Sequence, residues 1–156
     1  MRVALFQPDI AANAAAAIRL CACLDTPLAI IEPCGFVWDE RRLRRVGLDY
    51  LEQASLARFA SWSAFEAARH ATGERLVLLT KHAEHAYHLV RYRPDDVLLV
   101  GRESAGAPAM VHAAATVRVR VPMAPGRRSL NVVTALAIVL GEALRQTGGL
   151  FERGAR

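Results

Sequence analysis

The chain has 156 residues, of which 53% are hydrophobic and 22% charged, a composition that is typical of one globular domain and excludes an intrinsically disordered chain. No uncharged stretch reaches the roughly 20 apolar residues that a membrane span requires, and the N-terminus becomes polar too soon for a signal peptide, so we expect a cytoplasmic protein with no membrane partner. The net charge is +5 and every basic residue except Lys81 is arginine, which permits a nucleic-acid partner, although a coding bias would give the same excess.

Short apolar runs alternate with helical patterns along the chain. Strands are predicted over Arg2–Phe6, Pro27–Ile31, Ser55–Ala60, Arg75–Thr80, Asp96–Val100 and Thr116–Pro122. Helices are predicted after a cap at Asn13, from Asp39, from a cap at Ser63 to His70, over Ala107–Ala115 and over Asn131–Gln146. Strands separated by helices form a mostly parallel sheet with helices on both faces. We therefore predict a single α/β domain over residues 1–150 and a loosely ordered tail over residues 151–156.

Ligands of such sheets bind beyond the carboxyl ends of the strands, so the loops after Phe6, Thr80, Val100 and Val121 are the candidate sites. The loop Gly101–Pro108 contains two glycines, which permit a tight backbone close to a ligand. It fits neither the GxGxxG nor the P-loop pattern. Taken alone, this loop is explained better by an ordinary strand-to-helix turn than by a ligand site.

The loop that precedes the last predicted helix combines two prolines, a glycine and the adjacent Arg127 and Arg128. A rigid, cationic loop at a helix N-terminus favours anions or polar ligand groups. Ser129 or Asn131 could equally serve only as the cap of that helix.

Isolated and clustered arginines are the other candidates for RNA contact. Arg19 lies in the apolar run AAAAIRLCACL, where a charge needs either solvent or a partner, so it either points outward or lies at the edge of a cleft. In the helix predicted from Asp39, the apolar positions face the core and three arginines lie outside. This surface is either simply solvated or a phosphate-contacting patch, formed by Arg41, Arg44 and Arg45.

Metal and nucleophile chemistry find little support. His82, His85 and His88 recur at spacings of three, but no cysteine lies near them, and we predict no metal site. The three cysteines, Cys21, Cys23 and Cys34, form no CxxC pair and are interpreted as small buried thiols. We find no Ser-His-Asp or Cys-His pattern and no GxSxG elbow.

Five segments together resemble the SPOUT-class tRNA 2′-O-ribose methyltransferases, in the group that modifies the wobble cytidine or uridine. The resemblance extends from Arg2 to about Gly149. Each segment is modest alone, but the five in this order and spacing are specific, and the second one points to the wobble group. The segments are PDIxxN…IRLC (residues 8–21), IIEPxGFxWDxxRLRRxGLDY (30–50), LLTK (78–81), GxExxGxP (101–108) and VPM…RSLN (121–131).

This resemblance implies an α/β fold of the SPOUT/SpoU type with a C-terminal trefoil knot, a homodimer, and S-adenosylmethionine bound in the knot without a metal. It implies methyl transfer to the ribose 2′-oxygen of the wobble nucleotide in the anticodon stem-loop of tRNA. The residues implied to contact the cofactor, largely through backbone groups, with Met123 and Leu130 on the adenine side and Glu103 organising the middle loop, are Leu78, Gly101, Glu103, Val121, Met123, Ser129 and Leu130. The residues implied to contact RNA are Asn13, Arg41, Arg44, Arg45, Arg127, Arg128 and Asn131.

Arg19 matches the arginine that the family is thought to use on the ribose hydroxyl. Because arginine stays protonated in proteins, we expect it to orient a phosphate and stabilise negative charge rather than to act as a base. The chain departs from the family in having Ala14–Ala16 where Thr-Gly-Asn is usual, and Ala107 in place of leucine. The alanines leave open a non-catalytic RNA-binding homodimer of the same fold, and a 2′-O-methyltransferase acting on another RNA, such as ribosomal RNA, is the second alternative.

Overall fold

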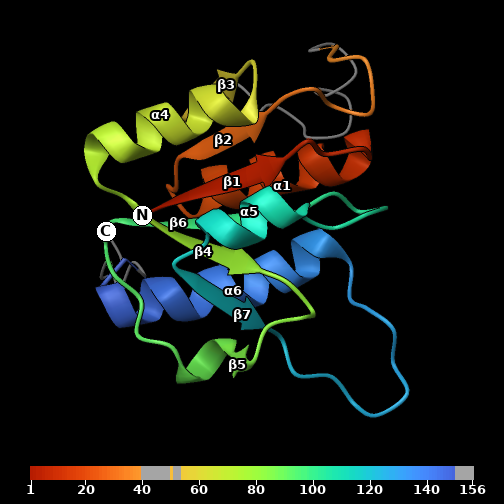
Figure 1. Cartoon of the computed structure of the whole chain (residues 1–156), viewed down its shortest axis with the longest axis vertical. Coiled ribbons are helices and arrows are strands. Elements are labelled where there is room, and N and C mark those ends of the chain that lie inside the picture. The colour runs from red at the N-terminus through yellow and green to blue at the C-terminus, as the bar shows by residue number, and fades with distance from the viewer. Residues whose placement is uncertain (40–49, 51–53, 150–156) are drawn as a thin grey trace, which may run out of the picture.

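The computed structural model describes residues 1–39, 50 and 54–149 of the chain. The strands of this part form one sheet in the order β3-β2-β1-β6-β4-β7-β5, and every neighbouring pair is parallel (Figure 1). The predicted parallel sheet is therefore confirmed. The strands are β1 (Arg2–Phe6), β2 (Leu28–Ile31), β3 (Leu56–Phe59), β4 (Arg75–Leu79), β5 (His85–Ala86), β6 (Asp96–Val100) and β7 (Val117–Arg120).

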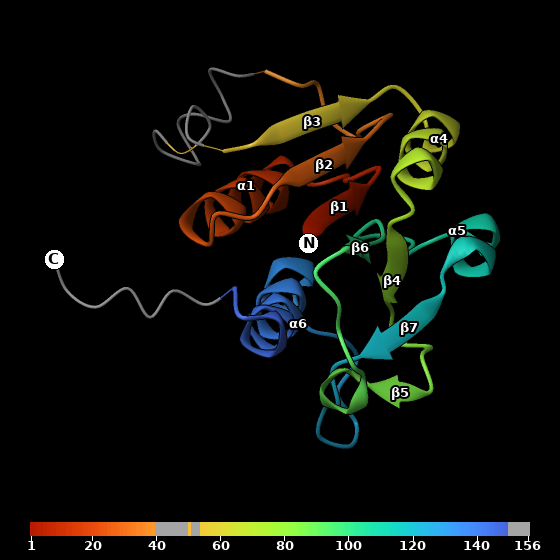
Figure 2. The ribbon, with the colours of Figure 1, turned by 90° about the vertical axis from the view of Figure 1, so that its left-hand side faces the viewer.

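Helices cover both faces of this sheet. In Figure 2, α1 and α6 lie on one face, and α4 and α5 lie on the other. The prediction of helices on both faces is thus confirmed, whereas the C-terminal trefoil knot stays a prediction. The helices are α1 (Ala11–Cys23), α4 (Trp62–Thr72), α5 (Ala109–Ala114) and α6 (Val132–Thr147), and a short 3-10 helix, η1, spans Tyr87–Leu89.

The sheet separates two apolar cores. On one face, α1 presents Ala14, Ala17, Ile18 and Cys21, whose spacing of three and four residues places them on one side of the helix, and all four are buried against β1, β6 and α6. On the other face, α4 and α5 pack on the strands through Phe65 and Val111, among others. Because both faces are covered, β1, β2, β4 and β6 read in the sequence as nearly continuous apolar runs.

Two predicted helix caps are wrong and one is confirmed. The helix α1 begins at Ala11, because alanine forms helix readily, and Asn13 therefore lies inside its first turn instead of capping it. The cap of α4 is Ser61, which accepts a hydrogen bond from the Ala64 amide at 3.1 Å, and not Ser63. Of the two candidate caps for α6, Ser129 and Asn131, it is Asn131 that caps the helix, accepting from two of its backbone amides.

Two short elements were not predicted from the sequence, and two predicted segments lie outside the described residues. The strand β5 and the 3-10 helix η1 were not predicted, since two and three residues are too few for a periodic pattern. The helix expected from Asp39 lies over residues 40–49, outside the described part of the chain, and so does the predicted tail over residues 151–156. No helix among the described residues is long and apolar enough to cross a membrane.

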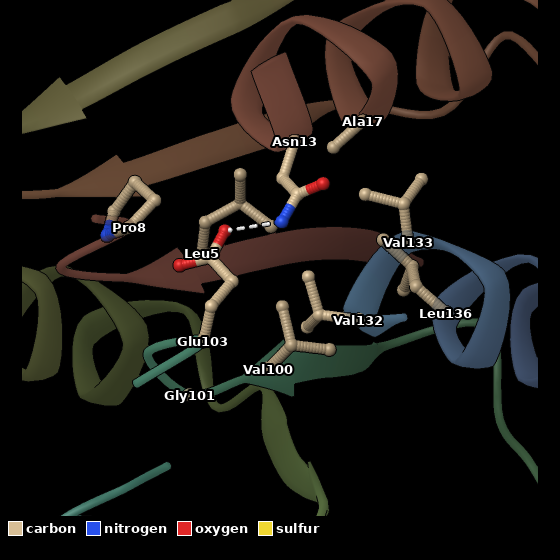
Figure 3. A pocket seen from close by; sticks show the side chains of 10 residues that line it. All are labelled: Leu5, Pro8, Asn13, Ala17, Val100, Gly101, Glu103, Val132, Val133 and Leu136. Atoms are coloured by element: carbon tan, nitrogen blue, oxygen red, sulfur yellow. Dashed lines mark hydrogen bonds between the residues drawn. The ribbon is translucent and has the colours of Figure 1, made fainter. Parts of the chain in front are cut away.

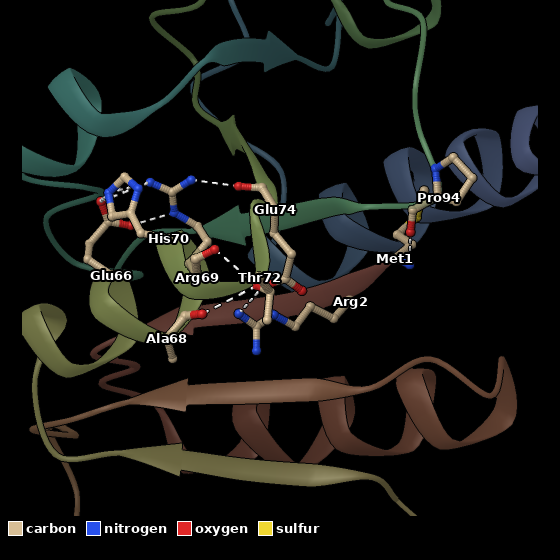
Figure 4. Close-up of polar contacts among 9 residues, drawn as sticks. All are labelled: Met1, Arg2, Glu66, Ala68, Arg69, His70, Thr72, Glu74 and Pro94. Carbon is tan, nitrogen blue, oxygen red and sulfur yellow. Dashed lines mark hydrogen bonds and ion pairs between the residues drawn. The ribbon is translucent and has the colours of Figure 1, made fainter.

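Charged groups are paired at the amino ends of the strands, away from the loops that follow them. Arg69 of α4 is buried and donates to the Glu66 carboxylate and to the Glu74 carbonyl, while Arg2 of β1 pairs with the Glu74 carboxylate (Figure 4). The terminal ammonium of Met1 donates to the carbonyl of Pro94 in the same region. This end of the sheet is therefore occupied by internal polar contacts.

The most deeply buried carboxylate also lies at this end. Asp96, fully buried at the start of β6, accepts from Arg75 Nε at 2.6 Å and from a second guanidinium nitrogen at 2.7 Å. It also accepts from the Arg93 amide at 2.8 Å. Hydrogen bonding to Asp96 raises the pKa of Arg75, so the guanidinium stays charged.

Replacing Asp96 by alanine is expected to lower the free energy of unfolding by about 3 kcal/mol or more, because it leaves a partly buried guanidinium and a backbone amide without their acceptor. Urea denaturation measures this loss. The matched control is Asp95→Ala at the exposed neighbouring position, which is expected to change stability by less than about 0.5 kcal/mol. Equal losses in the two variants would contradict the importance of the buried pair.

Candidate functional site

An open groove of about 610 Å³ lies at the carboxyl ends of β4, β6 and β7. Its volume is within the range of small-molecule sites, and its position is the one expected for ligands of parallel sheets. Three of the four loops that the sequence analysis selected, those after β4, β6 and β7, form its walls. The lining includes Leu79, Thr80, Lys81, Gly101–Ala107, Val119–Val121, Met123 and Ser129–Val132.

The loop after β6 is folded tightly on itself. The backbone of Arg102 and Gly106 is joined by two hydrogen bonds, of 3.0 and 2.8 Å, and Gly106 has a φ of +69°. A Cβ added to Gly101 would lie 2.4 Å from the backbone nitrogen of Ala107. Glycine is thus required at position 101 by close backbone approach and at position 106 by its left-handed conformation.

The loop between β7 and α6 forms the opposite wall. Val121, Met123, Ser129 and Leu130 line the groove, and Leu130 keeps 41% of its surface exposed. Arg127 and Arg128 are exposed in the same loop but are not among the lining residues. In Figure 1 this loop extends from the body of the molecule at the end to which the strand arrows point.

A chain of side-chain hydrogen bonds crosses from α6 to the loop after β6. The Asn131 amide donates to the Asn13 carbonyl oxygen at 3.0 Å, and the Asn13 amide donates to Glu103 Oε1 at 3.1 Å. Figure 3 shows the Asn13 and Glu103 side chains pointing toward each other above the ends of β1 and β6. Beneath them lies an apolar cavity of about 10 Å³, no more than the space of one water molecule. The two polar side chains therefore cover a closely packed part of the core.

Glu103 continues this chain to Asp9, in the turn after β1. The Asp9 amide donates to Glu103 Oε2 at 2.9 Å, and the Glu103 amide donates to Asp9 Oδ1 at 3.1 Å. Hydrogen bonding with the Glu103 side chain, followed by contacts with Ser104, outweighs burial and lowers the pKa of Asp9 from 3.8 to about 2. Burial, together with the neighbouring Asp9 side chain, raises the pKa of Glu103. Asp9 is thus the ionised member of the pair, and Glu103 is the one that takes up a proton first.

The groove carries more positive than negative charge. Lys81, Arg102 and Arg120 line it together with one carboxylate, that of Glu103. Arg102, Arg120 and Asp9 were not predicted from the sequence to have a role in the site. The signal that could have found them is their position, since all three lie at or just after the carboxyl end of a strand.

Several predicted site residues lie away from the groove. Arg19 is exposed on α1, with its guanidinium carbon 5.3 Å from the centre of the Tyr50 ring, and is not among the groove residues. Since it follows Asn13 by six residues, it stands about 9 Å further along the helix axis. Leu78 is fully buried in the core beside α4 and α5, and Leu79 lines the groove in its place.

Other candidates from the sequence are placed as follows. Arg41, Arg44 and Arg45 lie outside the described residues. His82, His85 and His88 are exposed and lie on a turn, on β5 and on η1, not on one helix. The three cysteines are free, but only Cys21 is fully buried, and burial raises its pKa to about 12.

The chain is similar to RNA methyltransferases over nearly its whole length. The sequence pattern of the SpoU rRNA methylase family matches residues 1–141. A tRNA (cytidine(34)-2′-O)-methyltransferase of Beijerinckia indica is 55% identical over 148 residues, which cover 95% of this chain and 92% of that protein.

Solved structures show the same relationship. A structure that concerns the 2-OH methylation of C/U34 on tRNA superposes with a TM-score of 0.89 and 36% identity, covering 96% of this chain and 97% of the other. A SpoU methyltransferase of Streptomyces viridochromogenes, in complex with its cofactor AdoMet, superposes with a TM-score of 0.82 and 26% identity over 94% of this chain and 60% of that one.

Alanine at Gly101 is expected to cost about 2–3 kcal/mol of stability, because the new Cβ meets backbone atoms that cannot move without opening the loop. Alanine at Gly106 is the matched control in the same loop. No atom lies within 4 Å of its added Cβ, so only the left-handed conformation is penalised, at about 1 kcal/mol. Urea denaturation of both variants tests this order, and an equal or reversed order would contradict the close packing of the loop.

The stability of Glu103→Gln relative to the parent is expected to rise with pH above about 4.5. A carboxyl whose pKa is raised in the folded state stabilises the protein below its unfolded pKa, and this contribution is lost as pH rises through the folded pKa. Glutamine does not titrate and avoids that loss, whereas the Asp9 titration falls below pH 4 and leaves this window free. Urea midpoints at pH 4.5, 5.5 and 7 measure the trend, and a pH-independent difference would refute the shift.

Proposed function

The chain belongs to the SpoU methylase family, and we propose that it transfers a methyl group from S-adenosylmethionine to the ribose 2′-oxygen of nucleotide 34, the wobble cytidine or uridine of tRNA. The observation that carries this proposal is the 55% identity with a tRNA (cytidine(34)-2′-O)-methyltransferase over 95% of the chain. The groove at the carboxyl ends of the strands supports it, because it provides one place for a small cofactor beside an exposed cationic loop.

The groove fits S-adenosylmethionine in size and in chemistry. Its tight Gly101–Ala107 loop brings backbone groups close to a ligand, and Met123 and Leu130 add apolar surface suited to an adenine ring. Backbone groups of Gly101, Val121 and Ser129 would hold the cofactor, and Leu79 would contribute from β4, where the sequence suggested Leu78. Bound S-adenosylmethionine supplies an electrophilic methyl group on a sulfonium sulfur.

The chain's own contribution to such a displacement is alignment and electrostatic stabilisation. Placing the ribose oxygen in line with the methyl group lowers the barrier of such a bimolecular transfer, by up to about 7–11 kcal/mol when the alignment is close. We propose that Arg19, which is exposed and stands beyond the groove, binds the phosphate beside the target ribose and stabilises negative charge on its oxygen. Its guanidinium stays protonated, so the hydroxyl proton passes to a phosphate or to water.

RNA binding is proposed along the same edge of the molecule. Arg127 and Arg128 are exposed beside the groove, and Asn13 and Asn131 lie at its floor. One chain offers a small surface for an anticodon stem-loop, and a homodimer would widen the cationic area, with Arg41, Arg44 and Arg45 added to it. We propose a homodimer for this reason.

Methyl transfer to unmodified tRNA, read by mass spectrometry of nuclease fragments, tests the proposal. We expect a 2′-O-methyl group on nucleotide 34, with turnover reduced about 100-fold or more in Arg19→Ala and about 10-fold in Arg19→Lys, which keeps the charge but not the planar fork. The control is Arg91→Ala, which should leave turnover unchanged. The Arg91 side chain is exposed, and it is the backbone carbonyl of Arg91 that accepts a hydrogen bond from Arg75 at the start of β4.

Each other outcome has a definite meaning. A methyl group at another nucleotide would keep the enzyme class and overturn the target. Full turnover in Arg19→Lys would contradict a role for guanidinium geometry. Binding of S-adenosylhomocysteine without methyl transfer to any RNA would favour the alternative of a non-catalytic RNA-binding protein with this fold.

A further inference from the structure

Asp9 makes several hydrogen bonds to the Gly101–Ala107 loop, through both its carboxylate and its backbone amide. Its carboxylate accepts from the Glu103 amide at 3.1 Å and from the Ser104 amide at 3.4 Å, and the Ser104 hydroxyl donates to the same oxygen. In return the Asp9 amide donates to Glu103 Oε2 at 2.9 Å. Two segments that lie 94 residues apart in the chain are thereby joined by bonds in both directions.

The other side of Asp9 is fixed by close backbone packing. The Gly35 amide donates to the Pro8 carbonyl at 2.9 Å, and a Cβ added to Gly35 would lie 2.6 Å from the Cβ of Asp9. Gln7, two residues before Asp9, adopts a φ of +45°, a left-handed conformation that a side chain disfavours. A turn that is strained on one side and packed on the other holds the Asp9 carboxylate in one place.

Glu103 connects Asp9 to the first turn of α1 and, through Asn13, to the start of α6. One carboxylate oxygen of Glu103 accepts from Asp9 and the other from Asn13, which in turn accepts from Asn131 at the start of α6. The loop after β6 is therefore tied to both helices by side-chain hydrogen bonds.

We propose that Asp9 is a positioning residue for the transfer reaction: it holds the Gly101–Ala107 loop in its cofactor-binding shape and in register with Asn13 on α1. This inference rests on the proposed function for the identity of the cofactor. The reciprocal hydrogen bonds between Asp9 and residues 103 and 104, called the interlock below, lie within the protein and do not depend on which cofactor binds.

The charge of Asp9 suits this role. Its carboxylate faces Arg102 Nε at 3.8 Å, as well as the Glu103 and Ser104 donors. The low pKa of Asp9 keeps it ionised at neutral pH, and hydrogen bonds to an ionised acceptor are stronger than neutral ones. Asparagine has nearly the same shape but replaces one acceptor oxygen with an NH2 donor. That NH2 group would face a donor, either the Glu103 amide or the Ser104 amide and hydroxyl, and the hydrogen bond there would be lost.

Hydrogen exchange of the protein without ligand tests the interlock directly. In Asp9→Asn, the amides of Glu103 and Ser104 are expected to exchange about 10-fold faster or more than in the parent, while amides in β1 and β6 exchange as before. Asp95→Asn, the same change at an exposed position at the far end of the sheet, is the matched control and should leave all of these rates unchanged.

Calorimetry with S-adenosylhomocysteine and filter binding with tRNA test the consequence for ligands. Asp9→Asn is expected to weaken S-adenosylhomocysteine about 10-fold or more and tRNA less than about twofold, because the loop, and not the arginine surface, is released. Ser104→Ala removes one donor to Asp9 and is expected to weaken S-adenosylhomocysteine about threefold. A general loss of structure would weaken both ligands together and would shift the urea midpoint in proportion.

Unchanged exchange and unchanged S-adenosylhomocysteine affinity in Asp9→Asn would overturn the inference. If that variant does not fold, Ser104→Ala decides: faster exchange at residue 104 with weaker binding supports the interlock, and parental values refute it. Failure of the parent protein to methylate nucleotide 34 would contradict the proposed function instead, and would leave the exchange results in force.

Discussion

The reciprocal hydrogen bonds between Asp9 and Glu103 are the contact on which the rest of the site depends. They are possible because β1 and β6 are neighbours in the sheet, with Leu5 opposite Val100, so that the turns after the two strands emerge side by side. The sheet order changes direction at this pair, since β2 and β3 extend from one side of β1 and the later strands extend from β6. The Asp9–Glu103 contact thus lies at the topological switch point of the sheet, and the groove opens beside it, at the carboxyl ends of β4, β6 and β7.

Stability and function are divided between the two ends of the same strands. At the amino ends, Asp96, Arg75 and Arg69 are satisfied by internal partners and leave little polar capacity for a ligand. At the carboxyl ends of β4, β6 and β7, the chain leaves an open groove lined by loop backbone and cationic side chains. The buried ion pairs fix the strands, and the fixed strands allow the loops beyond them to hold a precise shape.

The sequence predicted those parts of the fold that depend on local patterns. Apolar runs located β1 and β6 at their observed bounds, and Asn131 was one of two candidate caps because a cap and its helix are adjacent in sequence. Local reasoning failed for Asn13, whose amide is used by Glu103, a residue 90 positions away. It also gave Asp9 no role, because its partners are brought to it only by the pairing of β1 with β6.

The alanines that replace the usual family residues after Asn13 have a structural explanation. Ala14 and Ala15 lie on the buried side of α1 and are fully buried, whereas Ala16 is exposed. The segment therefore serves as a continuous helical turn that packs closely on the rest of the protein. The hydrogen bonds that join α1 to Glu103 and to Asn131 are made by Asn13 alone and survive the replacement. At the exposed position, Ala16, the replacement leaves a small apolar side chain in place of a polar one. The change thus alters the exposed surface of α1, while the hydrogen bonds that hold the loop after β6 against α1 remain intact.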